Sequence, residues 1–251
     1  MEEKIRVGIV SYLNSRPLIY GLERLPIKNR IQLIEAHPAL LADKLKNNEI
    51  DLGLVPVAII PQLENYYING SFCIGAVGDV ASVALFSEVP IGHVKKIYLD
   101  YQSRSSVQLL KWLLKHHWQI SPQLVETSDE SYISKIKEDT AALIIGDRAL
   151  EKRSSSTYIF DLAGEWKQAT GLPFVFAAWV STKQLPTEFI EEFDQANAFG
   201  LHHIDEIARE HHNDIYDLKK YFSINLSYTM DEKKKKGLDK FLRELALPIN
   251  I

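Results

Sequence analysis

The sequence has very little cysteine and no apolar run long enough to cross a membrane. Its single cysteine, Cys73, excludes an internal disulfide and a metal site built from several cysteines. The longest apolar runs, such as residues 174–180, are much shorter than the roughly 20 residues of a membrane-spanning helix. Positive charge is not in excess, since the net charge is −4, and phosphate binding requires clustered cations. We therefore expect neither a membrane nor a nucleic acid as a partner.

Motifs for common cofactors and nucleophiles are also missing. No G-x-G-x-x-G follows a predicted strand, and neither a Walker A sequence nor a G-x-S-x-G is present. Several histidines are adjacent in pairs, for example His202 and His203. Neighbouring residues on a helix point in different directions, whereas the ligands of a metal ion must face one another. The sequence therefore predicts no cofactor and no metal site.

The composition is that of an ordinary globular protein. The 251 residues are 46% hydrophobic and 25% charged, which provides ample material for one large domain or two smaller lobes. No apolar segment precedes the first predicted strand at residues 4–10. We therefore expect no secretory signal and a cytoplasmic location.

Predicted strands and helices alternate along the first part of the chain. A strand at residues 4–10 precedes a helix at 17–25, and a helix at 38–47 precedes a strand at 51–55. This order with short connections is typical of a mainly parallel sheet covered by helices.

The same alternation begins again after a β-rich run at residues 81–87, and the chain becomes mainly helical after residue 180. We interpret this restart as an α/β fold of two lobes with mainly parallel sheets and a ligand cleft between them. The first lobe would comprise residues 1–87 and 178–251, and the second would comprise 88–177. Strands near 81–87 and 174–180 would form the hinge. A single-lobe Rossmann-like fold is the alternative.

Two polar turns follow predicted strands, where open parallel sheets bind their ligands. The first, at residues 11–16, includes Asn14, and the second, at 100–106, includes Ser105 and Ser106. Each turn opens a helix, whose free N–H groups and dipole attract anions. One such turn alone is more typical of a helix cap, but two of them in two lobes favour an anion site. Residues 161–173 are expected to form a long polar loop that either closes over a ligand or only connects two elements.

Six separated segments carry a resemblance to a known family. They are residues 10–18 (VSYLNSRPL), 51–56 (DLGLVP), 81–87 (ASVALFS), 100–106 (DYQSRSS), 143–150 (LIIGDRAL) and 161–179 (DLAGEWKQATGLPFVFAAW). In this order they resemble the chorismate dehydratase family, which catalyses the first step of the futalosine route to menaquinone. The resemblance implies a two-lobed fold of the type II periplasmic-binding-protein kind. It also implies dehydration of a small-molecule substrate, chorismate, to 3-[(1-carboxyvinyl)oxy]benzoate without a cofactor.

The resemblance also implies roles for individual residues. Asn14 would lie at the reacting centre, and Ser82 would donate a hydrogen bond to the substrate. Ser105 and Ser106 would receive a carboxylate. The other residues expected to bind substrate are Ser11, Tyr12, Arg16, Pro56, Asp147, Thr170 and Gly171. The motifs contain no histidine or glutamate placed as a general base, so the enolpyruvyl carboxylate of the substrate is expected to take the proton while positioned donors assist.

Three alternatives stay open. The first is the sister enzyme of the same pathway, which forms 1,4-dihydroxy-6-naphthoate. The second is a non-enzymatic protein that binds small anions, and the third is the effector-binding half of a transcription regulator. The SYLNSRPL and GDRAL motifs favour the dehydratase. The sequence makes no prediction of the oligomeric state.

Overall fold

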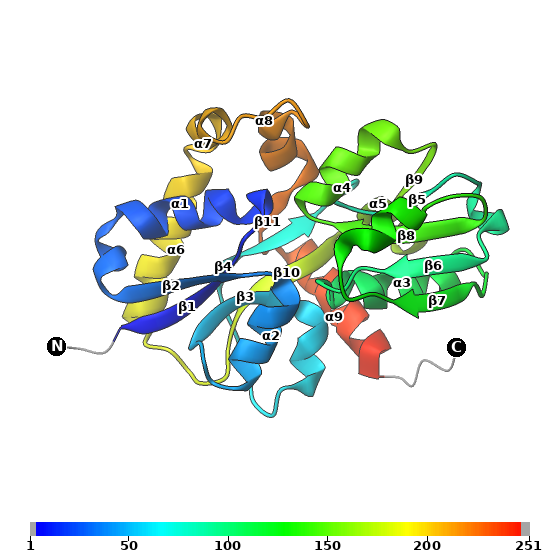
Figure 1. The fold of residues 1–251 in the computed structure, drawn as a ribbon. Coiled ribbons are helices and arrows are strands. Elements are labelled where there is room, and N and C mark those ends of the chain that lie inside the picture. Colours follow the sequence, from blue (N-terminus) through cyan, green and yellow to red (C-terminus); the bar gives the residue numbers. More distant parts are fainter. Residues whose placement is uncertain (1–3, 247–251) are drawn as a thin grey trace.

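Two sheets, each flanked by helices, form two lobes that lie side by side (Figure 1). The computed structural model describes residues 4–246. The first sheet has the strand order β11-β4-β10-β3-β1-β2, and the second has the order β7-β6-β8-β5-β9. The strands are β1 (Ile5–Val10), β2 (Ile31–Ala36), β3 (Leu52–Pro56), β4 (Tyr67–Ala76), β5 (Val83–Ser87), β6 (Lys96–Leu99), β7 (Gln123–Glu126), β8 (Thr140–Ile145), β9 (Tyr158–Asp161), β10 (Phe174–Ser181) and β11 (Ser227–Thr229).

The helices cover the faces of these sheets and bridge the lobes. They are α1 (Arg16–Arg24), α2 (Pro38–Lys46), α3 (Ser105–His116), α4 (Asp147–Lys152), α5 (Leu162–Thr170), α6 (Thr187–Leu201), α7 (Ile204–Glu210), α8 (Leu218–Lys220) and α9 (Glu232–Ala246). None of the helices in the described part of the chain is long and apolar enough to cross a membrane.

The predicted α/β fold with two lobes is confirmed, and its sheets are mixed. Strands β2, β1 and β3 are parallel in the first sheet, as are β7, β6 and β8 in the second. The chain enters β5 from the first lobe and β10 from the second lobe. Each of these two strands pairs antiparallel with both of its neighbours. The carboxyl ends of the two parallel sets carry the polar turns that the sequence singled out.

The two strands expected at the hinge each lie within one sheet. Strand β5 pairs with β8 and β9 of the second sheet, whereas β10 is inserted between β3 and β4 of the first. Every residue of both strands is buried, because each strand is covered on both faces. The chain passes between the sheets in residues 77–82 and 171–173. We propose to divide the lobes in these two segments.

The expectation of a long polar loop at residues 161–173 is wrong. This segment forms α5, whose N-terminus is capped by the Asp161 carboxylate through the N–H groups of Ala163 (3.2 Å) and Gly164 (3.3 Å). Gly171 ends the helix in the left-handed conformation, with φ +74°. The apolar face of α5 is short, and its largest side chain, that of Trp166, is completely buried.

An aromatic cluster joins the lobes below the cleft. The ring of Trp166 in α5 lies 4.8 Å from that of Trp112 in α3, 5.4 Å from Phe174 in β10 and 6.0 Å from Phe241 in α9. Figure 1 shows α9, in red, running beneath the junction of the two lobes. The C-terminal helix therefore packs against both lobes.

Between α7 and α9 the chain is less regular than the mainly helical structure expected after residue 180. A three-residue helix, α8, continues into a single π-helical turn, Tyr221–Asn225. Strand β11 then pairs with β4 at the edge of the first sheet. This segment returns to the mouth of the cleft and contributes to the site.

Candidate active site

A narrow pocket with a free volume of about 40 Å³ lies between the lobes. It is lined by Val10, Tyr12, Asn14, Pro38, Pro56, Ile74, Val80, Ser82, Val83, Ser103, Ser105, Ser106, Ile145, Gly146, Phe176 and Ala177. None of these lining residues, all within the described range 4–246, carries a charged side chain. Hydroxyl, amide and backbone groups are therefore the polar groups that a ligand would meet.

The lobes touch across the mouth of this pocket. The Tyr12 hydroxyl donates to Gln102 Oε1, and the Ala39 N–H donates to the Gln102 carbonyl over 3.2 Å. The Leu13 N–H donates to Asp147 Oδ1 over 3.1 Å. In each pair one partner comes from the first lobe and the other from the second, so the structure is a closed form.

Asn14 lies in a 3-10 turn, Leu13–Ser15, that joins β1 to α1. The turn is fixed from both sides. Ser15 Oγ donates to the Val10 carbonyl, and the Tyr228 hydroxyl of β11 donates to the Asn14 carbonyl over 3.0 Å. Asn14 Oδ1 is buried, and among the described residues it has no hydrogen-bond partner. Because an unpaired buried acceptor costs about 1–3 kcal/mol, this oxygen is suited to a donor on a ligand.

Ser82 follows a strained turn in the passage from β4 to β5. Its N–H donates to the Val80 carbonyl over 2.8 Å, which closes a three-residue turn around Ala81. Ala81 has φ +65°, a conformation that residues with a Cβ rarely adopt and that often occurs at functional sites. Ser82 Oγ is buried and, like Asn14 Oδ1, has no hydrogen-bond partner within residues 4–246.

Groups from three other segments hold this turn in place. The Asp161 carboxylate accepts from the N–H groups of Val80 (3.0 Å) and Ala81 (2.8 Å). Arg153 Nη1 donates to the Ala81 carbonyl over 3.0 Å, and the Gly146 N–H donates to the Ser82 carbonyl over 2.8 Å. Burial raises the pKa of Asp161 to about 6, despite the N–H groups that favour its charged form. The surroundings therefore fix the direction of Ser82.

The second polar turn places three serines at the start of α3. Ser103 Oγ accepts from the Ser106 N–H over 3.1 Å. Ser105 Oγ accepts from the Ala58 N–H over 3.2 Å and donates to the Phe176 carbonyl over 2.8 Å. Because a hydroxyl has one hydrogen, Ser105 has none left for a ligand in this conformation. The Ser106 hydroxyl makes no such contact with the described residues and lines the pocket.

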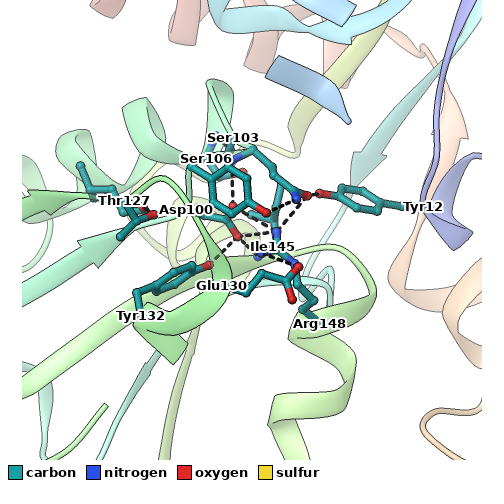
Figure 2. A network of polar contacts seen from close by, with 12 residues as sticks. Tyr12, Asp100, Ser103, Ser106, Thr127, Glu130, Tyr132, Ile145 and Arg148 are labelled. Carbon is teal, nitrogen blue, oxygen red and sulfur yellow. Dashed lines mark hydrogen bonds and ion pairs between the residues drawn. The ribbon is translucent and has the colours of Figure 1, made fainter. Parts of the chain in front are cut away.

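A buried carboxylate, Asp100, organises the second lobe behind the pocket (Figure 2). Its side chain is 0% exposed and accepts from Arg148 Nη2 (2.9 Å), the Tyr132 hydroxyl (2.8 Å) and the Ile145 N–H (3.0 Å). Arg148 Nη2 also donates to Gln102 Oε1 over 3.1 Å, the same atom that accepts from Tyr12 in the other lobe. The network therefore extends from the core of the second lobe to the contact that closes the cleft.

Six of the expected site residues line the pocket, namely Tyr12, Asn14, Pro56, Ser82, Ser105 and Ser106. Five do not. Ser11 is exposed, and Arg16 Nη1 lies 3.7 Å from Glu35 Oε1. Asp147 faces the Leu13 N–H behind the pocket, and burial raises its pKa to about 6.

Thr170 and Gly171 do not reach the pocket either, because they end α5. The Thr170 hydroxyl donates to the Trp166 carbonyl over 2.7 Å and accepts from the Leu172 N–H over 3.2 Å. The Thr170 hydroxyl therefore uses its hydrogen and an acceptor position within its own helix and cap. In this conformation neither residue is placed to contact a ligand.

The supporting roles of Gln102 and of Tyr228 in the C-terminal segment were not predicted from the sequence. Gln102 lies inside the DYQSRSS motif, so the motif could have indicated it as a site residue. Tyr228 carries no comparable signal, because a three-residue strand has too few residues to show a period.

Comparison with known proteins agrees with this architecture. The profile of a menaquinone biosynthesis family matches residues 5–246. A chorismate dehydratase of Thermus thermophilus is 27% identical over 265 residues, covering 96% of this chain and 95% of the relative. A chorismate dehydratase of Campylobacter jejuni is 24% identical over 94% of this chain and 95% of the relative.

Solved structures share the fold at low sequence identity. Protein AF1704 from Archaeoglobus fulgidus matches with a TM-score of 0.76 and 19% identity, over 97% of this chain and 96% of that chain. The alkanesulfonate-binding protein SsuA from Xanthomonas axonopodis matches with a TM-score of 0.66 and 17% identity, over 98% and 95% of the two chains. The CA3427 gene product of Candida albicans, described as having the generic periplasmic binding protein fold, matches with a TM-score of 0.65 and 12% identity, over 100% and 92%. The fold is therefore that of periplasmic binding proteins, and the chain belongs to the menaquinone biosynthesis family.

Proposed function

We propose that this protein is a chorismate dehydratase that converts chorismate to 3-[(1-carboxyvinyl)oxy]benzoate in the futalosine route, in the cytoplasm. One observation carries the proposal for this member of the family. Asn14 Oδ1 and Ser82 Oγ are buried and unpaired at a closed pocket whose described lining contains no charged side chain.

The reaction is a 1,2-elimination. The C3–H bond of chorismate breaks, its electron pair forms the C3–C4 double bond, and the C4 hydroxyl leaves with a proton as water. The ring becomes aromatic, which supplies much of the driving force. The protein must therefore hold the substrate in one conformation and stabilise the leaving oxygen, tasks that fixed hydrogen-bonding groups perform well.

The proposed base is the enolpyruvyl carboxylate of the substrate. The pocket lining supplies no carboxylate or imidazole that could act instead. The carboxyl of Asp147, which follows the lining residue Gly146, accepts a hydrogen bond from the Leu13 N–H, next to Asn14 in the chain. Its proposed role is to hold the Asn14 turn when the lobes close.

Asn14 and Ser82 are the proposed catalytic residues. Their polar atoms would orient the enolpyruvyl carboxylate and assist departure of the hydroxyl. The Ser106 hydroxyl, together with the N-terminus of α3, is proposed to bind a carboxylate of the substrate. Tyr12 and Pro56 would complete the walls of the pocket.

Turnover with chorismate tests this proposal. Purified protein is mixed with chorismate, and the ultraviolet spectrum and the product mass are followed. A benzoate chromophore and a mass lower by one water are expected. Binding of chorismate without turnover would instead indicate a binding protein. Turnover only of the cyclic futalosine derivative, yielding a dihydroxynaphthoate, would indicate the sister enzyme.

A further inference from the structure

Asn14 lines the pocket from an irregular turn, so the direction of its side chain depends on what holds that turn. Asn14 Oδ1 is buried and has no hydrogen-bond partner among residues 4–246. No described residue therefore fixes this oxygen by a hydrogen bond. The backbone of the turn, Leu13–Ser15, consequently determines where the carboxamide oxygen points.

Two hydrogen bonds from distant segments reach the backbone of this turn. The Leu13 N–H donates to Asp147 Oδ1 over 3.1 Å, and the Tyr228 hydroxyl donates to the Asn14 carbonyl over 3.0 Å. Asp147 belongs to the second lobe, so the first bond exists only while the lobes are closed. Tyr228 lies in β11, which belongs to the same sheet as β1, the strand that leads into the turn. The bond from Tyr228 is therefore kept whether the cleft is open or closed.

The chemistry of the two groups determines the direction of the bond from Tyr228. A backbone carbonyl has no hydrogen to give, so the phenol is the donor. Tyr228 is buried, and it is not among the residues that line the pocket. The hydrogen of its hydroxyl is thus used to hold the turn and not to bind a ligand.

The strand that carries Tyr228 is attached to β4 on both sides of this residue. Ser227 pairs with Gly75 before it, and the Met230 N–H donates to the Ser71 carbonyl over 2.8 Å after it. The backbone of Tyr228 is therefore fixed relative to the first sheet, and the Asn14 turn is fixed through the phenol.

A buried lysine of α9 secures the next residue of β11. Lys234 is 0% exposed, and its Nζ donates to the Thr229 carbonyl over 2.7 Å and lies 3.5 Å from Asp231 Oδ2. Burial of an ammonium group is unfavourable unless hydrogen bonds and an opposite charge offset its lost hydration. These partners restrict where the ammonium group can lie, so Lys234 also fixes the strand beside Tyr228.

We propose that Tyr228 is a positioning residue, whose hydroxyl holds the Asn14 carbonyl and so directs the Asn14 carboxamide at the bound substrate. This inference rests on the proposed dehydration of chorismate. Tyr228 does not touch the substrate, and its effect on the reaction passes entirely through Asn14.

The test is Tyr228→Phe, which keeps the ring and removes only the oxygen. We expect kcat with chorismate to fall about threefold to thirtyfold while KM changes little. This range lies between the loss of one hydrogen bond and a displacement of a reacting group by about 1 Å, which costs up to about a hundredfold. The melting temperature is expected to fall slightly, because the Asn14 carbonyl loses its donor.

Tyr216→Phe is the matched control. It removes a phenol hydrogen bond of similar length, 3.2 Å to Asn225 Oδ1, from the same C-terminal segment. Tyr216 does not line the pocket. This variant should lower the melting temperature by a similar amount and keep the kcat of the wild type.

A double-mutant cycle with Asn14→Ala separates positioning from a general structural effect. Asn14→Ala removes the side chain that Tyr228 is proposed to direct, so in this background Tyr228→Phe should cause no further loss of kcat. The slow residual rate is followed by product mass.

Three results would overturn the inference. Tyr228→Phe could keep the wild-type kcat, it could lower kcat by the same factor with and without the Asn14 side chain, or the control Tyr216→Phe could lower kcat as much. Wild-type protein that does not dehydrate chorismate refutes the proposed function itself, and this outcome is read before any variant is compared.

Discussion

Gly146 is the position at which one added methyl group tests the closed form most directly. It has φ +69° and ψ −149°, a region that is nearly restricted to glycine. A Cβ built there would lie 2.9 Å from the Tyr12 ring atoms Cδ2 and Cε2, closer than carbon atoms approach without displacement. Gly146→Ala therefore strains the backbone and pushes Tyr12 at the same time.

The two effects can be given magnitudes. The backbone conformation costs about 1–3 kcal/mol for a residue with a Cβ. Displacing the Tyr12 ring removes its hydrogen bond to Gln102, which is worth about 0.5–1.5 kcal/mol. We expect Gly146→Ala to lower the free energy of unfolding by about 1.5–4.5 kcal/mol, a fall in Tm of at least about 3 °C for a chain of this size. Loss of the contact between the lobes should also raise KM for chorismate.

Chemical denaturation of three variants measures these contributions. Tyr12→Ala removes the ring, so the double variant keeps the backbone strain and loses the clash. Gly146→Ala should therefore lower the free energy of unfolding less in the Tyr12→Ala background than in the wild type. The difference equals the contribution of the displaced Tyr12 ring. A Gly146→Ala protein whose free energy of unfolding is within about 0.5 kcal/mol of the wild type would refute the reasoning.

Three further predictions concern the same cleft. Asn14→Ala should lower kcat by at least about a hundredfold with an unchanged Tm, because its side-chain oxygen has no partner among residues 4–246; a near-normal rate would remove Asn14 from the mechanism. Ser105→Ala leaves the Ala58 N–H and the Phe176 carbonyl unpaired, so the free energy of unfolding should fall by about 1–3 kcal/mol in urea denaturation, and an unchanged value would contradict a role in joining the lobes. The folded Asp147 carboxyl keeps its proton up to about pH 6, whereas its ordinary pKa is 3.8, so between these values the folded state binds more protons and this group lowers stability as the pH rises. Asp147→Asn should remove that part of the slope when free energies of unfolding at pH 4 and pH 7 are compared, and an identical slope in both proteins would show that the carboxyl does not contribute.

The parts of the fold that the sequence predicted are those with strong local patterns. Strand β1 and helix α1 lie close to their expected bounds, because a buried strand and an amphipathic helix each leave a clear period. The family resemblance implied the site positions of Asn14 and Ser82, and the turn after the first predicted strand independently indicated Asn14.

The features that were not predicted depend on contacts between distant residues. Helix α5 was missed because three buried side chains, led by Trp166, are separated by polar residues that read as a loop. Sheet membership of β5 and β10 depends on pairing across more than fifty residues, which no local pattern reports. Tyr228 holds the Asn14 carbonyl from 214 residues away, so its role is visible only in the folded chain.

The position of β10 between β3 and β4 has a consequence for how the protein is made. The five strands of the second sheet run without interruption from Val83 to Asp161, so this lobe has all its strands before residue 174 leaves the ribosome. The first sheet lacks a central strand until β10 emerges, although β1 to β4 are synthesised earliest. Assembly therefore departs from the usual order in which the N-terminal unit folds first. Asn14 acquires the support of the Tyr228 hydroxyl only after β10 and β11 have emerged, so the Asn14 turn reaches its final form long after it has been synthesised.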